Sequence, residues 1–407
     1  MKRGADGEIT MDDVVKYARI HEQVLEGGTE YWLLDKAHKL NVLVDAAPFD
    51  HFFVRGKADT FQGVPLLVDG KACGTLDAPD VAALKKLASP APFGRGKKTV
   101  HDTTVRNAYH IDGERVTIDG LSFEYKFYDT IRKWSGLNID DHSVLYKLHI
   151  YPTGGHFGRH VDTPHGPGHI ASGILLLGSP YAGGRLVIEH NGHQESVTAE
   201  DVPGTFAAWY TDCPHWVESV TSGDRVVLQY DIVHPIVDAV LAGTFTVDKY
   251  IDAETGFFAD SGITHPPAVP AILNLIVAEV QVLLTQRKNV AILTDHCYLN
   301  KGGLRLETLK GRDKALVDAF TAAGLAVELH ACVLRRKGED DYDVGLLDGP
   351  RIRGATICIP GGDKQTMTIF DNPGAEHTGN QSMEPDEAYI HGVIFCRAPH
   401  NTKPAPS

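Results

Sequence analysis

The stretch that decides the fold is YPTGGHFGRHVDTPH, residues 151–165. It contains His160 and Asp162, which a single residue separates. Residues two apart in a strand point to the same face, so both side chains can reach one metal ion. His215, within FAAWYTDCPHWVESVTSGDRVVLQYDI at residues 206–232, supplies a third ligand from elsewhere. Two histidines and one carboxylate leave open positions on an octahedral ion, which is typical of non-heme Fe(II) sites, whereas a zinc hydrolase usually fills more of the shell with nitrogen or sulfur.

Short strand-like runs extend outward from these motifs over residues 143–233. They are SVLYKLHIY, HIASGILLLG, GRLVIEH, ESVTA, GTFAAWY, WVESV and DRVVLQYDIV, with Gly and Pro between them. Short strands at even spacing predict a β-sandwich or barrel, and a jelly roll can hold a metal between its sheets. We therefore expect the metal ligands at the mouth of such a fold.

The segments on either side have a mixed pattern. Before the core, an apolar run at residues 64–68 ends in Asp69-Gly70, a hairpin turn signal, and a helix is expected after Pro79. Residues 91–104 are expected to form a surface loop entering a strand at residues 105–111. Further helices are expected at residues 14–25, 123–134, 268–287 and 311–324, and strands at residues 290–296 and 326–336.

These patterns predict an α+β protein with three parts. Residues 1–126 would form a mixed α/β region, residues 127–235 the jelly-roll core and residues 236–407 a second mixed α/β region. A chain of 407 residues is long enough for such a division.

Composition indicates an ordinary soluble globular protein. Apolar residues make up 43% and charged residues 23% of the chain, and no window approaches the roughly 20 apolar residues of a membrane helix. The net charge of −14 comes from interspersed acids, and no basic stripe that could bind nucleic acid stands out. The N-terminus MKRGADGEITMDDVV shows no secretory signal, which favours a cytoplasmic or nuclear location. Six scattered cysteines without a CxxC pair argue against a disulfide framework.

Arg225 is a candidate carboxylate-binding residue beside the three metal ligands. It lies ten residues after His215, and a guanidinium fork can pair with both oxygens of a carboxylate. The acid that it would meet is the distal carboxylate of 2-oxoglutarate, because this co-substrate chelates iron through its other end.

The motifs between residues 151 and 231 together resemble those of a known enzyme family. The pattern YPxGGxFxxHxDT, followed by GG-R-L, H-x-V and GDR-VVLQYD, resembles prolyl 4-hydroxylase-like 2-oxoglutarate- and Fe(II)-dependent dioxygenases. The resemblance implies that His160, Asp162 and His215 bind iron and that Tyr151 and Arg225 hold 2-oxoglutarate. It also implies a core that is a double-stranded β-helix, a cupin-like jelly roll.

The resemblance further implies the activity. Such an enzyme uses Fe(II), 2-oxoglutarate and O2, with ascorbate as a candidate auxiliary reductant, to oxidise an unactivated C–H bond, and it releases succinate and CO2. Hydroxylation of a prolyl-type peptide or protein, or of a small amino-acid-like molecule, is the expected reaction; desaturation and cyclisation stay open. Asp162 argues against halogenation, because halogenases of this class carry a small residue there. No nucleic-acid or membrane partner is expected, and the oligomeric state is open.

Two alternatives from other classes are kept. One is a cupin-like metal-dependent hydrolase or isomerase that uses the triad without 2-oxoglutarate, and the other is a non-catalytic binding module. Several neighbouring residues have weaker claims to a role, and core packing or hydrogen bonding is the simpler expectation for them: Lys147, His149, His156, His165, His169, Trp209, Tyr210, Cys213 and Trp216.

Overall fold

The structure is a computed structural model of the 407-residue chain. It describes residues 52–58, 61–95, 98–118, 143–166, 168–201, 203–233, 271–286, 288–299, 304–336, 342–346, 355–358, 378–379 and 389–398, together with residues 40, 43, 44 and 130. The predicted helix at residues 14–25 and nearly all of that at residues 123–134 lie outside this set.

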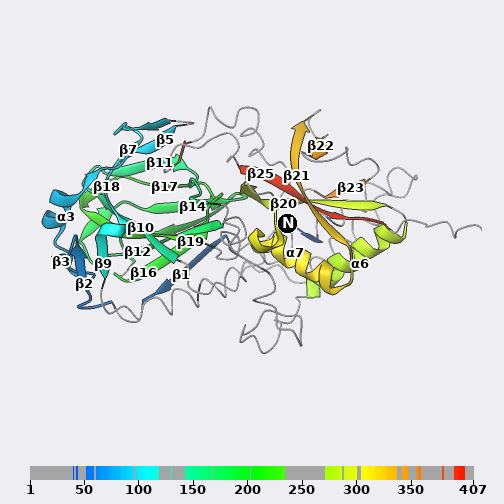
Figure 1. The fold of residues 1–407 in the computed structure, drawn as a ribbon, viewed down its shortest axis with the longest axis horizontal. Helices are drawn as coiled ribbons and strands as arrows, with labels where there is room; N and C mark the ends of the chain where they lie inside the picture. The colour runs from blue at the N-terminus through cyan, green and yellow to red at the C-terminus, as the bar shows by residue number, and fades with distance from the viewer. Residues whose placement is uncertain are drawn as a thin grey trace, which may run out of the picture.

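Two antiparallel sheets face each other in the first half of the described chain (Figure 1). The larger has the order β1-β16-β12-β19-β10-β8-β4 and the smaller β15-β14-β17-β11-β7. The strands of the larger sheet are β1 (Phe53–Lys57), β4 (Ser89–Pro90), β8 (Tyr109–Asp112), β10 (Ser143–Tyr151), β12 (His169–Leu176), β16 (Thr205–Tyr210) and β19 (Arg225–Val233). Those of the smaller sheet are β7 (Arg106–Asn107), β11 (His156–His160), β14 (Leu186–His190), β15 (His193–Val197) and β17 (His215–Val217).

The apolar runs of the sequence become the centre of the larger sheet. β12 and β16 are buried along their whole length, and β19 is buried up to its last residue. A strand that is covered on both faces needs apolar residues at nearly every position, which explains the continuous runs GILLL, TFAAWY and RVVLQYDI. β15, at the edge of the smaller sheet, is mostly exposed and polar instead. The predicted mostly antiparallel β core, consistent with a jelly roll, is thereby confirmed.

Strands from the N-terminal region extend this core. β2 (Pro65–Val68) and β3 (Lys71–Thr75) form the predicted hairpin, and Asp69 and Gly70 have φ values of 51° and 73°, as a type I′ turn requires. Together with β9 (Val116–Ile118) they form a three-stranded sheet. α3 (Val81–Leu87) follows, capped by the side chain of Asp80, so the helix begins two residues after Pro79, which was expected near its first turn.

The predicted loop at residues 91–104 is wrong in part. β5 (Phe93–Arg95) and β6 (Lys98–Val100) form a hairpin, and β24 (Thr378–Gly379) pairs with β5 from far along the chain. The single strand expected at residues 105–111 is divided at Ala108, because β7 pairs with β11 and β8 pairs with β10. The run WVESV is likewise divided between β17 and β18 (Val220–Gly223), and β18 pairs with β13 (Tyr181–Gly183).

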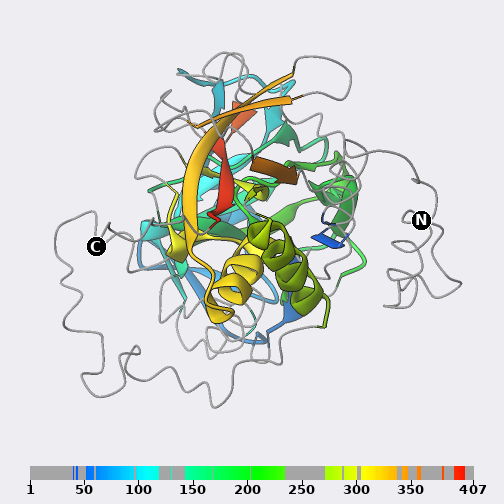
Figure 2. The same cartoon turned by 90° about the vertical axis from the view of Figure 1, so that its right-hand side faces the viewer.

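A separate five-stranded sheet with its own hydrophobic core lies in the C-terminal half of the chain, and its strand order is β22-β21-β25-β20-β23. Its strands are β20 (Asn289–Leu299), β21 (Val327–Arg336), β22 (Tyr342–Leu346), β23 (Ala355–Cys358) and β25 (Tyr389–Cys396). α6 (Ala271–Thr285) and α7 (Gly311–Ala322) cover one face of this sheet (Figures 1 and 2). The helices and strands predicted from residue 268 onward are confirmed. Leu40, Leu43 and Val44 belong to this second core although they come from the N-terminal region.

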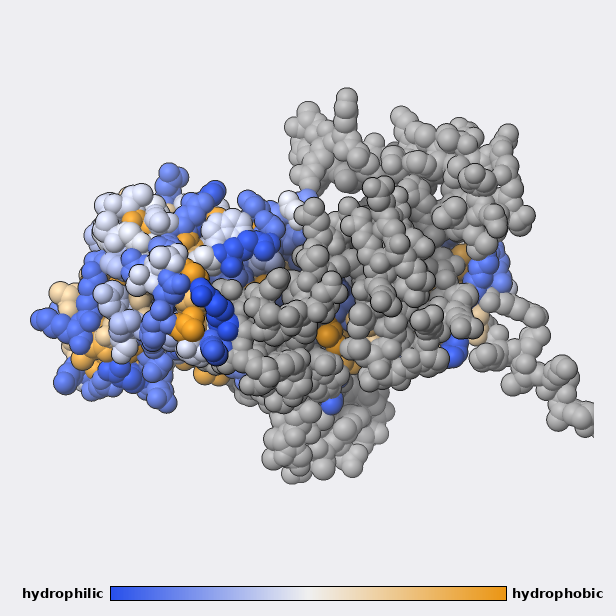
Figure 3. Space-filling view, turned by 90° about the horizontal axis from the view of Figure 1, so that it is seen from above, coloured by the Kyte–Doolittle hydropathy of each residue, from blue (hydrophilic) through white to orange (hydrophobic). Residues whose placement is uncertain are grey.

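The surface matches the composition. On the face drawn in Figure 3, hydrophilic residues dominate the described part and hydrophobic ones are scattered among them. Among the described residues, no helix has the length and apolar character needed to span a bilayer.

Candidate metal and co-substrate site

His160, Asp162 and His215 lie together between the two sheets. His160 ends β11, His215 begins β17, and the two are direct partners across the strand pair. One ligand atom from each of the three residues lies within 4.8 Å of the others, and Nε2 of His215 is 3.7 Å from Oδ1 of Asp162. Asp162 lies beyond the end of β11, so the strand period is not what aims its side chain. Its backbone N–H donates to the carbonyl of Thr211 at 3.2 Å, which fixes the turn.

The backbone sets the orientation of both histidines. Nδ1 of His160 lies 2.9 Å from the carbonyl oxygen of Gly158, and Nδ1 of His215 lies 3.0 Å from that of Cys213. A carbonyl can only accept, so each imidazole carries its proton on Nδ1 and keeps the lone pair of Nε2 for a metal. The fit to a divalent cation is therefore built into the fold.

Aromatic residues hold the two rings in place. Phe157 stacks on His160 with centroids 3.7 Å apart, and Trp209 lies 5.0 Å from His215. Both aromatic side chains are buried, so the two imidazoles have little room to rotate. Trp209 thus forms part of the pocket wall.

Arg225 and Tyr151 form the other end of the site. They are direct partners between β19 and β10, and the guanidinium carbon lies 5.5 Å from the centre of the tyrosine ring. Arg225 is 1% exposed, yet its Nε and Nη2 donate no hydrogen bond within the described part of the chain. A buried guanidinium with unused donors is costly unless a ligand satisfies it. A carboxylate is the group that fits this fork.

Gly184 allows the guanidinium to take this position. A Cβ at this residue would lie 3.2 Å from Cδ of Arg225 and 2.8 Å from Cγ2 of Val220, and the φ of 61° also favours glycine. Nearby, burial raises the pKa of Tyr181, and the positive charge of Arg225 opposes that rise. The GG-R-L motif of the sequence is thereby explained as space for Arg225.

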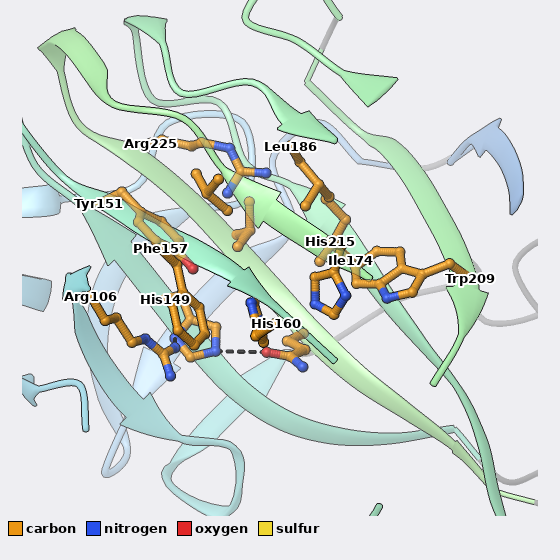
Figure 4. A pocket seen from close by; sticks show the side chains of 13 residues that line it. Arg106, His149, Tyr151, Phe157, His160, Ile174, Leu186, Trp209, His215 and Arg225 are labelled. Carbon is orange, nitrogen blue, oxygen red and sulfur yellow. Dashed lines mark hydrogen bonds between the residues drawn. The ribbon is translucent and has the colours of Figure 1, made fainter. Parts of the chain in front are cut away.

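A single cavity joins the two ends (Figure 4). Figure 4 shows Arg225 and Tyr151 on one side of this cavity with His160 and His215 on the other. The wall consists of Arg106, His149, Tyr151, Phe157, His160, Ile174, Leu186, Trp209, His215, Val217, Arg225, Val227 and Gln229.

A hydrogen-bonded chain crosses the wall of the cavity. Arg106 donates from Nη2 to Nδ1 of His149 at 3.3 Å, and Nε2 of His149 donates to Oε1 of Gln229 at 2.7 Å. Burial, reinforced by the charge of Arg106, holds the pKa of His149 well below its usual value, so this imidazole is neutral. Arg106 also lies 4.2 Å above the ring of Phe157, which orders a second buried cation beside the cavity.

The structure brings together all five residues predicted for the site. Of the weaker candidates, some line the cavity and others lie away from it. His149 and Trp209 line the cavity, whereas His156 bonds to the carbonyls of Gly154 and Thr104. The remaining weaker candidates lie elsewhere: His165 and His169 contact Asp231, Tyr210 accepts from the N–H of Gly311, and Lys147 and Trp216 are half-buried.

Seven lining residues are not among the candidates named from the sequence: Arg106, Phe157, Ile174, Leu186, Val217, Val227 and Gln229. Gln229 could have been found, because it lies four residues after Arg225 and thus on the same face of β19. Arg106 gives no local signal, since it comes from a two-residue strand outside the motif region.

Part of the chain is similar to known proteins. Residues 146–230 match the family model described as the 2OG-Fe(II) oxygenase superfamily. No curated protein matches the chain. Among solved structures, a Pseudomonas putida prolyl-4-hydroxylase shares 19% identity over 48% of this chain and 99% of its own, with a TM-score of 0.30. A Trichoplax adhaerens prolyl hydroxylase, solved with a hypoxia inducible factor peptide fragment, shares 17% over 51% and 94%, with a TM-score of 0.31.

The resemblance seen in the sequence is thereby confirmed, and the family match carries it. Residues 146–230 therefore carry a 2OG-Fe(II) oxygenase domain, an enzyme type whose cofactors are Fe(II), 2-oxoglutarate and O2. The residues present fit these groups, because Nε2 atoms and a carboxylate face one point and an unsatisfied buried guanidinium lies across the same cavity.

Proposed function

We propose that this enzyme is a dioxygenase that hydroxylates an unactivated C–H bond, with His160, Asp162 and His215 holding Fe(II) and with Arg225 and Tyr151 holding 2-oxoglutarate. The observation that carries the assignment is the buried guanidinium of Arg225, whose Nε and Nη2 have no acceptor in the described chain and which lines the same cavity as the histidines. A metal-dependent hydrolase or isomerase with the same triad does not require this buried guanidinium, whereas a 2-oxoglutarate-dependent enzyme does.

The strand order supports a double-stranded β-helix. Along the chain, strands alternate between the two sheets from β10 to β12, and the central strands β16, β12, β19 and β10 face β15, β14, β17 and β11. In the smaller sheet, β11 and β17 are neighbours, and His160 at the end of β11 is paired with His215 at the start of β17. The division into residues 1–126, 127–235 and 236–407 and the cytoplasmic or nuclear location stay predictions from the sequence.

Each side chain has a separate task in this proposal. When bound, iron and 2-oxoglutarate supply the oxidant from O2, with succinate and CO2 as co-products. Arg225 fixes the distal carboxylate by a two-pronged pair, and Tyr151 packs beside it. Phe157, Trp209 and Leu186 make the wall apolar and exclude water, while neutral His149 bonds to Gln229 and offers no charge of its own.

The substrate is proposed to be a prolyl-type peptide or protein or a small amino-acid-like molecule. The carboxylate of Asp162 fills the position that a halide would need, which favours hydroxylation over halogenation. Arg106 gives the cavity wall a second buried cation, so substrates that carry a carboxylate near the oxidised carbon are the first to test.

The test is a screen of amino acids and proline-containing peptides for stimulated conversion of 2-oxoglutarate into succinate. Product mass then separates the outcomes: a gain of one oxygen indicates hydroxylation, and a loss of two hydrogens indicates desaturation or ring closure. Substrate turnover without succinate release would overturn the proposal in favour of a hydrolase or isomerase.

A further inference from the structure

Three buried residues of the cavity wall form one hydrogen-bonded chain, which begins at a rigidly held guanidinium. Arg106 in β7, His149 in β10 and Gln229 in β19 are 5%, 3% and 7% exposed. Nη1 of Arg106 donates to the carbonyl of Pro92 at 2.9 Å, and its guanidinium carbon lies 4.2 Å from the centre of the Phe157 ring. These contacts hold the guanidinium in one place, so that Nη2 is directed at His149.

The guanidinium of Arg106 fixes the direction of every hydrogen bond in this chain. A guanidinium cannot accept, so Nδ1 of His149 is the acceptor of the 3.3 Å bond, and the neutral imidazole carries its one proton on Nε2. That N–H can only donate, so the Gln229 atom 2.7 Å away is the carbonyl oxygen Oε1. This bond is the only one that the Gln229 side chain makes within the described part of the chain. The amide nitrogen of Gln229, with its two N–H groups, is therefore left for a ligand.

Other polar atoms of the cavity wall are donors as well. Nε of Arg106, Nε1 of Trp209, and both Nε and Nη2 of Arg225 are buried and find no acceptor among the residues that the structure describes. Buried donors without acceptors are costly, and a ligand that brings acceptor oxygens satisfies them. A dicarboxylate suits such a wall, because each of its ends carries two acceptor oxygens.

Gln229 and Arg225 lie at different places along the same face of β19. Four residues separate them, which corresponds to about 13 Å of extended strand. Val227 lies between them on this face and is the cross-strand partner of His149. Figure 4 shows the bond between His149 and Gln229 at the end of the cavity where His160 lies, away from Arg225. A ligand held by Arg225 at one end therefore extends toward the Gln229 amide and the metal ligands.

From this polarity and placement we propose that Gln229 is a co-substrate-binding residue whose amide donates to the keto-acid carboxylate of 2-oxoglutarate. Arg106 and His149 are positioning residues that fix the orientation of this amide. The inference rests on the proposed function, in which Arg225 holds the distal carboxylate. The cavity thus recognises both carboxylates, one by a guanidinium fork and the other by an oriented amide. An amide that is already oriented loses little conformational entropy when the ligand binds.

The test is anaerobic titration of the full-length, Fe(II)-loaded protein with 2-oxoglutarate, followed through the visible metal-to-ligand charge-transfer band. Gln229→Met removes the amide donors, so the dissociation constant of 2-oxoglutarate should rise about 10-fold, as for a lost hydrogen bond to a charged group. Gln229→Glu keeps an acceptor for His149 but places an anion beside the carboxylate, so the rise should be about 100-fold. Gln194→Met, on the exposed strand β15, is the matched control and should bind 2-oxoglutarate as the unaltered protein does.

A second probe, 2-oxopentanoate, shows which end of the co-substrate Gln229 contacts. This molecule carries a methyl group in place of the distal carboxylate and keeps the keto-acid end. Gln229→Met should weaken the binding of both probes by a similar factor. Arg225→Ala should weaken the binding of 2-oxoglutarate and leave that of 2-oxopentanoate unchanged.

The positioning residues are tested through His149. His149→Phe keeps a ring without hydrogen bonds, so the amide of Gln229 is free to turn, and the dissociation constant of 2-oxoglutarate should rise about 3-fold. His149→Gln returns a donor to Gln229 and should restore most of the affinity, while equal affinities of the two variants would show that the chain does not position the amide. Thermal unfolding confirms that each variant is folded.

Two results would overturn the assignment of Gln229. One is an unchanged 2-oxoglutarate affinity in both Gln229→Met and Gln229→Glu, and the other is a loss in Gln229→Met that 2-oxopentanoate does not share. If the unaltered protein itself gives no band with 2-oxoglutarate, the proposed function fails, and this inference fails with it.

Discussion

Two of the histidine groups in the described part of the chain differ in what holds their rings. In the triad of His160, Asp162 and His215, each histidine is anchored through Nδ1 to a backbone carbonyl two residues earlier in the chain. In the group of His190, Cys213 and His296, the anchors are the carboxylates of Asp295 and Asp212, at 105 and 84 residues' separation. The first arrangement forms once one pair of strands has formed, whereas the second needs both halves of the described chain.

This difference predicts separate functions and sensitivities. A centre that is oriented by its own backbone keeps its geometry when distant parts of the chain shift, as catalysis requires. A group that is held by side chains from two sheets keeps its geometry only while those sheets pack against each other. Changes at the triad should therefore abolish chemistry with little loss of stability, and changes at the interface should first reduce stability.

The largest effect is expected at the triad. Asp162→Ala removes the only carboxylate of the triad. Losing a residue that merely hydrogen-bonds to a metal ligand typically costs about 10- to 100-fold, so the loss of a ligand should lower iron binding and succinate formation by more than about 100-fold. Metal analysis and turnover measure both losses. His193→Ala, an exposed histidine on β15, is the matched control and should behave as the unaltered protein. Normal iron content in Asp162→Ala would contradict the assignment.

The interface should respond in stability. Asp212→Asn removes the carboxylate that pairs with the buried ammonium of Lys310, and breaking a buried pair in this way typically costs about 3–5 kcal/mol. The free energy of unfolding in urea measures the cost. Asp318→Asn, which removes an exposed partner of Lys314, should change it by less than about 0.5 kcal/mol. Equal effects of the two substitutions would remove the distinction between the two regions.

The co-substrate clamp should show an intermediate effect. A hydrogen bond to a charged group contributes about 1.5–3 kcal/mol, so Arg225→Ala should raise the KM for 2-oxoglutarate about 10- to 100-fold. Arg225→Lys should recover part of the affinity, since it restores the charge without the fork. Arg185→Ala is the control, because this exposed arginine pairs only with Glu218 among the described residues. An unchanged KM in Arg225→Ala would disprove the clamp.

The smallest effect tests the space reserved for that clamp. Gly184 and Gly192 both have positive φ, at 61° and 79°, but only a Cβ at residue 184 would press on Arg225. Both alanine variants carry the backbone strain, and Gly184→Ala adds overpacking of about 1 kcal/mol or more. An energy of about 1 kcal/mol corresponds to a KM for 2-oxoglutarate about 5-fold higher in Gly184→Ala. The KM should be unchanged in Gly192→Ala. If the two variants have a similar KM, Gly184 has no role in binding 2-oxoglutarate.

The sequence predicts the first region well because its information is local. The run from Tyr151 to Asp162 and the strand that contains Arg225 carry ligand types, turn glycines and alternation together. The details that failed depend on distant partners. A strand was expected to aim both His160 and Asp162, but β11 ends at His160, and a register shift between Phe157 and His160 buries both of these side chains. The segment at residues 91–104 forms a hairpin whose outer partner, β24, lies at residues 378–379.

The second region was beyond sequence reasoning for the same reason. His190, Cys213 and His296 have no common motif, and of the three only Cys213 was a candidate from the sequence, with a weaker claim to a role. Only the packing of β20 against the turn after β16 brings His296 to Cys213, and that packing depends on a buried network that includes Asp212 and Lys310. Arg106 likewise reaches the cavity through tertiary pairing of a two-residue strand.

The central claim is that Arg225 and the triad bind 2-oxoglutarate and Fe(II) in one cavity, and anaerobic titration tests it most directly. Adding Fe(II) and 2-oxoglutarate to the metal-free protein without oxygen should produce a weak visible metal-to-ligand charge-transfer band. The band should require higher 2-oxoglutarate in Arg225→Ala and should not form in Asp162→Ala. If no band forms in the unaltered protein, or if Arg225→Ala titrates with the same 2-oxoglutarate concentration, the assignment is contradicted.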